Sequence, residues 1–566
     1  MKAARPIVVR DHPGAAALAS LMSLDPLLAR LYAMRGVRTP EELDYGLGKL
    51  IPVGMLENVD AAVELLLEKR TERIIVVGDF DVDGATSTAL VLRCLRAFGF
   101  ADVDYLVPNR FRFGYGLSPE IVRVAKESSP GLLLTVDNGI SSIDGVACAN
   151  SLGIPVLVTD HHLPAEQLPD ARVIVNPNLA NSRFPSKNLA GVGVAFYLLA
   201  ALGKRLEVEG HAGAARIPAR YLDLVALGTV ADVVPLDRNN RILVEQGLRR
   251  IRAGRAVVGI TALLHQAGRD PGRTVSTDLG FAAGPRLNAA GRLEDMALGI
   301  ECLLTDDPAT AARHATTLDT INRDRREIEA DMRDQAFAFV DRMDPDRMPA
   351  CISVYDASWH QGVVGLIASR VKDRCHRPVI AFAREGGGML KGSARSVSGV
   401  HVRDLLESIA TEKRGLIGKF GGHAMAAGLT IAEADFAEFR ELAARRLGHM
   451  YPDADFSGAI VSDGELPGTA LGLEFARHLR AAGPWGAGFP EPLWSGDFEL
   501  LEQRTVGENH LKMRVRSAAG AAVDAIAFNQ AGPAYRGTVR LAYRLDVNEY
   551  RGVERPQLIV EQVSAL

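Results

Sequence analysis

Acidic and imidazole side chains recur in the first half of the chain, each time directly after a short apolar run. They are Asp79, Asp81 and Asp83 in GDFDVDG, Asp137 in VDNG, and Asp160, His161 and His162 in TDHH. Nearby carboxylates raise one another's pKa unless cations neutralise them. Mixed oxygen and imidazole ligands suit Mn²⁺, with Mg²⁺ as a harder substitute. The residue types therefore predict an oxygen-rich metal site with a nitrogen ligand.

The acidic run could instead form an EF-hand loop or a solvated turn. An EF-hand loop needs Glu at its twelfth position, but the twelfth residue from Asp79 is Leu90. A solvated turn would account best for an isolated triplet, but here acids recur at equivalent strand ends. Farther on, Asp232 is the lone acid in LGTVADVVPL. A metal ligand and a helix-capping or buried paired acid account for it about equally well.

The elements around these residues alternate between apolar runs and helical stretches from about residue 51 to 177. This rhythm predicts βαβ units and a parallel sheet. Ligands gather at the carboxyl ends of strands in such sheets, so we expect the acids and imidazoles to meet there. A more helical section follows, in which the turn-forming residues of PRLNAAGR at 285–292 predict an interruption.

The rest of the chain changes pattern twice. A charged stretch at 307–343 has apolar residues at near-helical spacing, which predicts a long connecting helix. A second α/β unit is expected from about residue 350, and period-two strands beyond 451 predict a small β-barrel. We therefore divide the chain into segments 1–50 (helical), 51–305 (parallel-sheet domain), 306–346 (connecting helix), 347–449 (second α/β domain) and 450–566 (barrel).

Composition excludes several classes of protein. The chain has 566 residues, 47% of them hydrophobic, a formal net charge of −4 and five cysteines without a CxxC pair. This pattern argues against a disulfide framework or a zinc knuckle and favours a reducing cytoplasm. A membrane span needs about 18 uninterrupted apolar residues, and no run approaches that length, so no membrane association is expected.

One barrel strand carries a separate signal for nucleic acid. In HLKMRVRS, alternation places Leu511, Met513 and Val515 on one face. The opposite face carries His510, Lys512, Arg514 and Arg516. A basic face on a five-stranded barrel suits an OB-fold that binds single strands. The alternative is a solvated edge strand whose charges discourage aggregation.

The motifs GDFDVDG, VDNG, TDHH and GTVADVVPL, in this order, resemble the four motifs of the DHH phosphoesterase superfamily. The chain is similar over almost its whole length to the bacterial RecJ family of single-strand-specific exonucleases. The further motifs that carry this resemblance are PNRFRFGYGL, GPRLNAAGR, HQGVVGLIASR, KGSARS, FGGHAMAAG and PWGAGFPEPLW. The resemblance implies that the parallel-sheet domain is a DHH domain, the second α/β domain a DHH-associated domain (DHHA1), and the barrel an OB-fold.

The resemblance also implies two metal ions. Their ligands would be Asp79, Asp81, Asp83, Asp137, His161 and Asp232. Asp137 would bridge the ions, Asp81 would bind one, and Asp83, His161 and Asp232 would bind the other. Asp79 would be a direct or an indirect ligand. His162 would contact the scissile phosphate or the departing oxygen, and Asp160 would orient the site through a hydrogen bond.

Residues outside the metal site would bind DNA phosphates. The resemblance implies this function for Arg110, for Ser393 and Arg395 around a terminal phosphate, and for Arg286 and Asn288 at the next one. Surface solvation or helix capping is the competing interpretation of Arg286 and Asn288. Gly422 and His423 belong to a glycine-rich run that would offer backbone amides to phosphate, with tight helix packing as the alternative.

The expected function is a Mn²⁺- or Mg²⁺-dependent exonuclease that degrades single-stranded DNA from the 5′ end, releases 5′-mononucleotides, and serves DNA repair and recombination. A monomer is expected, and single-stranded-DNA-binding protein is a partner implied by the family. Two alternatives remain open at this point. One is a phosphodiesterase for short oligonucleotides or cyclic dinucleotides, or a pyrophosphatase; the other is a non-catalytic DHH-like scaffold that binds DNA.

Overall fold

The computed structural model describes residues 5–108, 116–344, 347–532 and 534–566. They form two compact units, each described separately below. The first contains Met1–Gly291, Asp295–Asp319 and Ala459–Leu566, and the second contains Arg292–Glu294 and Thr320–Gly458. No helix of the described residues is long and apolar enough to cross a membrane.

A five-stranded parallel sheet organises the first unit, in the order β3-β2-β4-β5-β6. Its strands are β2 (Arg73–Val77), β3 (Asp102–Leu106), β4 (Leu132–Val136), β5 (Val156–Thr159) and β6 (Val173–Val175). The central strands are buried on both faces, which explains their uninterrupted apolar sequences. The predicted parallel sheet is therefore confirmed.

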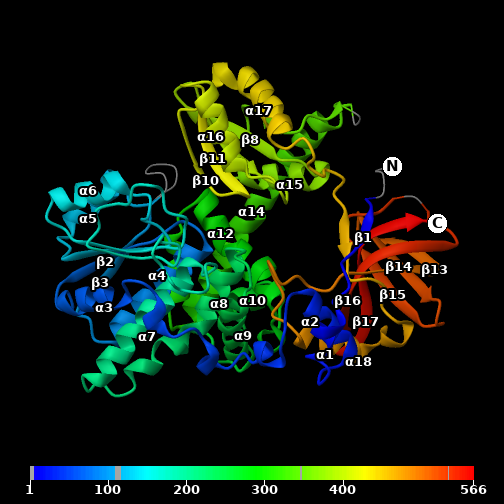
Figure 1. Cartoon of the computed structure of the whole chain (residues 1–566), viewed down its shortest axis with the longest axis horizontal. Helices are drawn as coiled ribbons and strands as arrows, with labels where there is room; N and C mark the ends of the chain where they lie inside the picture. Colours follow the sequence, from blue (N-terminus) through cyan, green and yellow to red (C-terminus); the bar gives the residue numbers. More distant parts are fainter. Residues whose placement is uncertain (1–4, 109–115, 345–346, 533) are drawn as a thin grey trace. The chain divides into compact units, whose positions relative to one another are not determined.

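Helices cover both faces of this sheet (Figure 1). On one face lie α3 (Val59–Glu68), α4 (Val82–Ala97) and α7 (Gly191–Val208), and on the other α5 (Pro119–Glu127) and α6 (Ile143–Ser151). Alternate residues of β2 point into the two cores, as expected for a strand with side chains on both faces.

Further helices extend the first core. They are α8 (Leu222–Ala231), α9 (Arg238–Arg252), α10 (Val258–Gln266), α11 (Ser276–Asp278), α12 (Gly284–Leu293) and α13 (Ala297–Leu304). The prediction that PRLNAAGR interrupts the helical section was wrong, because this motif forms most of α12. Its small residues Ala289 and Ala290 are fully buried. Close tertiary packing thus outweighs the weak local preference for a turn.

The second unit contains the sheet β10-β11-β9-β8-β7. Its strands are β7 (Ile352–Tyr355), β8 (Val379–Gly386), β9 (Met389–Arg395), β10 (Lys419–Gly422) and β11 (Ala426–Ala432), and its helices are α15 (Val364–Cys375), α16 (Val402–Glu412) and α17 (Phe436–Met450). The predicted long helix is α14 (Pro308–Val340), which begins in the first unit and continues into the second.

A closed barrel forms near the C-terminus, in the order β13-β14-β15-β17-β16. Its strands are β13 (Trp494–Val506), β14 (His510–Ser517), β15 (Ala522–Ala527), β16 (Thr538–Tyr550) and β17 (Val553–Ala565). This five-stranded barrel confirms the prediction of an OB-like fold.

The N-terminal segment packs beside the barrel within the first unit. β1 (Ile7–Val9) pairs in parallel with β12 (Ile460–Ser462), and α2 (Pro26–Met34) contributes Leu31 to the barrel core together with α18 (Leu473–Ala481). A short helix, α1 (Ala15–Ala19), precedes α2 in this segment.

Candidate metal centre

The acids and imidazoles follow the carboxyl ends of three neighbouring strands of the parallel sheet. Asp79 follows β2, Asp137 follows β4 with its backbone in the left-handed region (φ 61°), and Asp160 directly follows β5. Asp81 caps α4, where its side chain accepts a hydrogen bond from the Gly84 amide at 3.0 Å. Asp83 lies in the first turn of α4, so the three acids of GDFDVDG do not share one extended segment.

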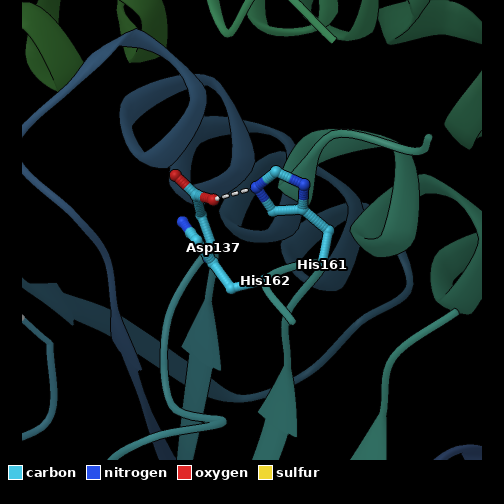
Figure 2. Close-up of side chains that lie close together, drawn as sticks. All are labelled: Asp137, His161 and His162. Carbon is cyan, nitrogen blue, oxygen red and sulfur yellow. Dashed lines mark ion pairs between the residues drawn. The ribbon is translucent and has the colours of Figure 1, made fainter. Parts of the chain in front are cut away.

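The side chains converge in three groups, and within each group one ligand atom per residue lies within 4.8 Å of the others. The groups are Asp79–Asp81–Asp137, Asp83–His161–Asp232 and Asp137–His161–His162. Nε2 of His161 lies 3.1 Å from Oδ1 of Asp137 (Figure 2). The same nitrogen lies 3.6 Å from Oδ2 of Asp232. Asp137 and His161 therefore connect the three groups into one continuous centre.

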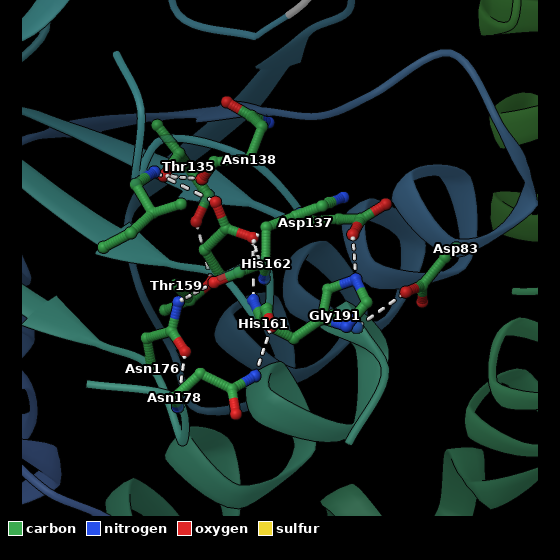
Figure 3. Close-up of polar contacts among 12 residues, drawn as sticks. Asp83, Thr135, Asp137, Asn138, Thr159, His161, His162, Asn176, Asn178 and Gly191 are labelled. Carbon is green, nitrogen blue, oxygen red and sulfur yellow. Dashed lines mark hydrogen bonds and ion pairs between the residues drawn. The ribbon is translucent and has the colours of Figure 1, made fainter. Parts of the chain in front are cut away.

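The N-terminus of α7 holds Asp83 in place. The amide of Gly191 donates to Oδ2 of Asp83 at 2.6 Å (Figure 3). The amide of Val192 donates to Oδ1 at 2.9 Å. A carboxylate is favoured at this end of a helix because the free amides and the helix dipole are positive. Asp83 is thus oriented by a segment more than 100 residues away, which the motif GDFDVDG alone could not indicate.

Asp160 is oriented by donors that follow its own strand, β5, and the neighbouring strand, β4. Its Oδ1 accepts hydrogen bonds from the amides of His161 and His162 and from Nδ1 of His162, at 2.7, 3.0 and 2.7 Å, and its Oδ2 accepts from the Ile140 amide at 2.9 Å. Asp160 belongs to none of the three candidate ligand groups. The carboxylate therefore fixes the TDHH loop and one imidazole.

The pKa values of this pair move apart. Burial by itself would raise the pKa of Asp160, but the adjacent His162 imidazolium and the hydrogen bonds hold it well below its usual range. Burial by itself would lower the pKa of His162, but the Asp160 carboxylate outweighs it and raises this pKa to about 9. His162 is therefore a cation at neutral pH.

Sequence reasoning missed two amide side chains that support the same loop. Asn176 and Asn178 follow β6 and donate to the carbonyls of His162 and His161 at 2.9 and 2.6 Å (Figure 3). The signal for them is VNPN, which places polar residues at the end of a strand, as the acidic motifs do.

Burial and mutual repulsion oppose ionisation of the carboxyl groups. Burial, with the charge of Asp232, raises the pKa of Asp83 to about 7. Burial, with the charge of Asp81, raises that of Asp232 to about 7, and burial with the charge of Asp83 raises that of Asp137 well above its usual range. Burial and the charge on His162 lower the pKa of His161. A neutral imidazole among acids is the form that binds a metal.

Two buried atoms support the fit of a divalent cation. Among the described residues, neither Nε2 of His161 nor Oδ2 of Asp232 has a hydrogen-bond partner. Such buried polar atoms cost free energy unless a water or an ion satisfies them. The oxygen and imidazole donors suit Mn²⁺ and Mg²⁺, so the residues present fit the expected metal.

The residues predicted to contact phosphate near the metal centre differ in their surroundings. Arg110 lies outside the described residues. Arg286 is buried on α12, where it forms an ion pair with Asp319 at 2.8 Å and donates to the Ala282 carbonyl at 2.7 Å. Asn288 is half-buried two residues later on the same helix. Arg286 would therefore have to share its guanidinium between Asp319 and a phosphate.

Ser393 and Arg395 lie together on β9 in the second unit, with Nη1 of Arg395 donating to Oγ of Ser393 at 2.9 Å. A Cβ on Gly365 would come within 2.9 Å of the Arg395 guanidinium and 3.0 Å of Ser393 Oγ. The glycine therefore lets both side chains approach the first turn of α15. A cation and a hydroxyl at a helix N-terminus can bind a phosphate.

Gly422 and His423 lie where β10 turns into β11, and the His423 amide donates to the Ala426 carbonyl at 2.7 Å. The two strands pair in an antiparallel hairpin. The run itself is not helical, and both of its interpretations, phosphate binding by its backbone and close packing against a helix, stay predictions.

The basic face of β14 has the predicted alternation, since Leu511, Met513 and Val515 are buried in the barrel. β14 pairs with β13 on one side and β15 on the other, so the edge-strand alternative was wrong. The face also contains acids: Lys512 lies 3.7 Å from Asp524 and Arg516 lies 2.9 Å from Glu499. Arg514, between them, is exposed.

Three family models match separate parts of the chain. They are the DHH family N-terminal domain over residues 73–229, the DHHA1 domain over 347–449 and the RecJ OB domain over 462–562. The first match includes all the candidate metal ligands except Asp232, which lies three residues beyond it.

Similar proteins extend over nearly the whole chain. The protein named single-stranded-DNA-specific exonuclease RecJ is 52% identical in Salmonella typhimurium, over 95% of this chain and 96% of the relative. It is 51% identical in Escherichia coli, over 95% and 96%. A crystal structure of RecJ from Thermus thermophilus in complex with Mn²⁺ has a TM-score of 0.82 at 32% identity, covering 99% of this chain and 80% of that one. A Mg²⁺ complex has a TM-score of 0.77 at 30% identity, covering 99% and 78%.

Proposed function

Since the chain belongs to the RecJ family of single-stranded-DNA-specific exonucleases, we propose that it hydrolyses single-stranded DNA from the 5′ end and releases 5′-mononucleotides. The chain is a metal-dependent nuclease. Beyond this, we propose the polarity of degradation, the mononucleotide product and the use of two metal ions. The alternatives of a short-oligonucleotide or cyclic-dinucleotide phosphodiesterase, a pyrophosphatase and a non-catalytic scaffold are not supported by the relatives, which are named as exonucleases.

The observation that carries the proposal is the pair of adjacent ligand groups. Asp79, Asp81 and Asp137 form one, and Asp83, His161 and Asp232 form the other. The 3.1 Å contact between Asp137 and His161 joins them. We infer that Asp137 serves both sites and that Asp79 is a direct or an indirect ligand of the first. Mn²⁺ is the expected ion and Mg²⁺ its substitute.

Two divalent ions in such a centre supply a water of lowered pKa and neutralise charge on the attacking and departing oxygens of a phosphodiester. The chain's own residues arrange the remaining chemistry. The α7 amides fix Asp83, and neutral His161 offers Nε2. His162, kept protonated by Asp160, can donate to a phosphate oxygen or to the departing oxygen. No separate protein base is required.

We propose that residues of the second unit set the direction of degradation by binding the 5′ end. Ser393 and Arg395 at the start of α15 would bind the 5′-terminal phosphate, because the hydroxyl, the guanidinium and the helix amides all favour an anion. Arg286 and Asn288 would hold the next backbone phosphate, and Arg110 would also bind a phosphate. The backbone amides near Gly422 and His423 would donate hydrogen bonds to phosphate oxygens. Lys512, Arg514 and Arg516 would bind the strand farther from the cut.

The cellular setting follows from the family rather than from the fold. We propose a monomer that acts in DNA repair and recombination in the cytoplasm and is recruited by single-stranded-DNA-binding protein. Sedimentation of the purified chain and co-purification with that partner would test these points independently of catalysis.

Digestion of single strands labelled at either end tests the function directly. With Mn²⁺, we expect labelled mononucleotide to appear first from the 5′ label, with a duplex of the same sequence resistant. Asp137→Ala should lower the rate by at least about a hundredfold while strand binding remains, since one ligand group loses a member and the contact of Asp137 with His161 of the other group is lost. Mononucleotide appearing first from the 3′ label would contradict the proposed polarity.

A matched pair of variants tests the terminal-phosphate site. Arg395→Ala should remove any preference for a 5′-phosphate over a 5′-hydroxyl end. Arg414→Ala, which changes an exposed arginine of the same unit, should leave that preference unchanged. If both variants kept the same preference for a 5′-phosphate end, Arg395 would not be the residue that recognises that end.

A further inference from the structure

The backbone that carries Asp232 changes direction abruptly. Asp232 is the residue that ends α8, and Val233 after it has a φ of 62°. A β-branched residue rarely adopts this left-handed conformation. The Val233 side chain is 68% exposed, so its own packing does not hold the backbone there. Strained conformations of this kind persist where the surrounding structure fixes them, and the contacts that do so lie farther along the chain.

Asp232 differs from the other candidate ligands in how it is oriented. Asp83 accepts two amide hydrogen bonds from α7, and Asp81 accepts one within its own helix turn. Among the described residues, buried Oδ2 of Asp232 accepts no hydrogen bond. The direction of this carboxylate therefore depends on the backbone on either side of it.

The segment after Val233 is tied through Leu236. The Leu236 amide donates to the Ala487 carbonyl at 2.7 Å, and Nη1 of Arg241 donates to the Leu236 carbonyl at 3.0 Å. Arg241 is buried and its guanidinium carbon lies 4.3 Å from the centre of the Phe489 ring. Both polar backbone groups of Leu236 are thus held by a loop that precedes the barrel, or by an arginine resting on that loop.

The loop at 484–489 is itself well anchored. Its two aromatic rings, Trp485 and Phe489, stack with centroids 5.2 Å apart and an angle of 14°. The Trp485 carbonyl accepts a hydrogen bond from Ser276 Oγ at 2.6 Å, and its indole donates to the Leu479 carbonyl at 3.0 Å. Each of these contacts lies within the first unit, so the loop can act as a fixed support.

Gly488 brings the loop against Pro235. Its φ is +69°, and a Cβ at this position would lie 3.1 Å from Cβ of Pro235 and 3.4 Å from its Cα. Any side chain here would push on the segment between Asp232 and Leu236.

We propose that the 484–489 loop is a clamp that positions Asp232 for metal binding. This inference rests on the proposed function, because it assumes that Asp232 is a metal ligand. The loop residues lie outside the three ligand groups and act through the backbone of residues 233–236. Metal affinity in the parallel-sheet domain would thereby depend on a loop more than 240 residues after Asp232 in the chain.

Gly488→Ala and Gly268→Ala provide a matched test in the full-length chain. Gly268 has the same φ of +69° but no neighbour within 4 Å, so both variants add equal backbone strain and only one pushes on Pro235. Mn²⁺ binding, measured by electron paramagnetic resonance of the free ion, should weaken about tenfold in Gly488→Ala, the lower end of the effect of a supporting residue. Gly268→Ala should bind Mn²⁺ as the wild type does. Wild-type affinity in Gly488→Ala would overturn the clamp.

A second pair is used if Gly488→Ala does not fold. Arg241→Met removes the donor to Leu236 and the cation on Phe489, whereas Arg241→Lys keeps a cation that can donate. Mn²⁺ affinity should fall in Arg241→Met and be partly restored in Arg241→Lys. Equal affinities in both variants and the wild type would also overturn the proposal.

Asp232→Asn separates failure of the clamp from failure of the metal-site assignment. Unchanged Mn²⁺ binding in Asp232→Asn would refute Asp232 as a ligand, and the clamp with it. Weakened binding there, with normal binding in Gly488→Ala, would refute the clamp alone. In the double variant, Gly488→Ala should add little to Asp232→Asn, because effects that act through one group are not additive. Fully additive losses would indicate general structural damage and contradict positioning.

Discussion

At the scale of residues, the two adjacent histidines acquire opposite properties. Their rings lie 4.5 Å apart, yet the pKa of His161 is lowered by burial and by the charge of its neighbour, while that of His162 is raised to about 9. The difference comes from Asp160, whose Oδ1 accepts a hydrogen bond from His162 Nδ1. One imidazole is therefore suited to a metal and the other to a phosphate.

Asp160→Asn should abolish this difference. Without the carboxylate, burial dominates, so the pKa of His162 in the metal-free protein should fall from about 9 to its ordinary value near 6.5 or lower. NMR titration of labelled histidines in the full chain measures it directly. A His162 pKa that stays near 9 would show that another group holds the proton.

The same pair gives stability a defined pH dependence. The folded-state pKa of His162 is above its unfolded value, so its contribution is complete below about pH 6.5 and is lost as pH rises through about 9. Asp160, whose folded-state pKa is lowered, contributes above its unfolded value of about 3.9 and loses that contribution in acid. In Asp160→Asn the alkaline loss between about pH 6.5 and 9 should disappear from thermal unfolding curves of the metal-free protein.

At the scale of elements, β14 shows how a closed sheet changes the meaning of a charged face. An edge strand uses exposed lysine and arginine to prevent pairing, but β14 is paired on both sides. Prevention of edge pairing therefore does not explain its outward cations, and we propose that they bind a DNA backbone, as an OB-like barrel can. Glu499 and Asp524 reduce the positive charge of this face without removing it.

Neutralising this face should change the salt dependence of binding. The triple variant Lys512→Gln, Arg514→Gln, Arg516→Gln should bind single strands more weakly, and its slope of log affinity against log salt should flatten by about 0.7 for each lost phosphate contact. Fluorescence anisotropy over a range of salt concentrations gives the slope. Arg540→Gln on β16, where the arginine is paired with Asp497, is the matched control. An unchanged slope in the triple variant would remove β14 from the DNA-binding surface.

At the scale of the whole molecule, chain segments from opposite ends are joined in the first unit. Arg35 beside α2 and Asp463 after β12 form a buried ion pair at 2.8 Å, with both side chains at most 1% exposed. Asp463 also accepts from the Leu493 amide at 3.0 Å. Breaking a buried pair leaves an uncompensated charge and is far more costly than breaking an exposed one.

Asp463→Ala should therefore destabilise the protein by about 3 kcal/mol or more, because Arg35 remains buried without its partner. Asp497→Ala, which breaks the half-exposed pair with Arg540, should cost no more than about 1 kcal/mol. Scanning calorimetry of the two variants at equal concentration compares them. Similar unfolding temperatures would indicate that water or another group compensates Arg35.

Most elements and the types of ligand could be predicted from local sequence patterns, whereas the helix formed by PRLNAAGR could not. The alternating apolar runs and helical stretches predicted the parallel sheet, and the acids and imidazoles at strand ends indicated the candidate metal centre. These predictions succeeded because strand periodicity, helix periodicity and ligand type are local properties of the chain. The order of the motifs indicated the family, which the relatives then established.

The contacts between distant segments became visible in the folded chain alone. It placed Asp83 on the α7 amides, paired Arg286 with Asp319, made a helix of PRLNAAGR, and brought the 484–489 loop against Leu236. Each of these contacts joins residues that are distant in the chain or depends on burial that a local pattern does not encode. Side-chain partners are set by packing of the whole unit, so the sequence could name the ligands but not the groups that hold them in position.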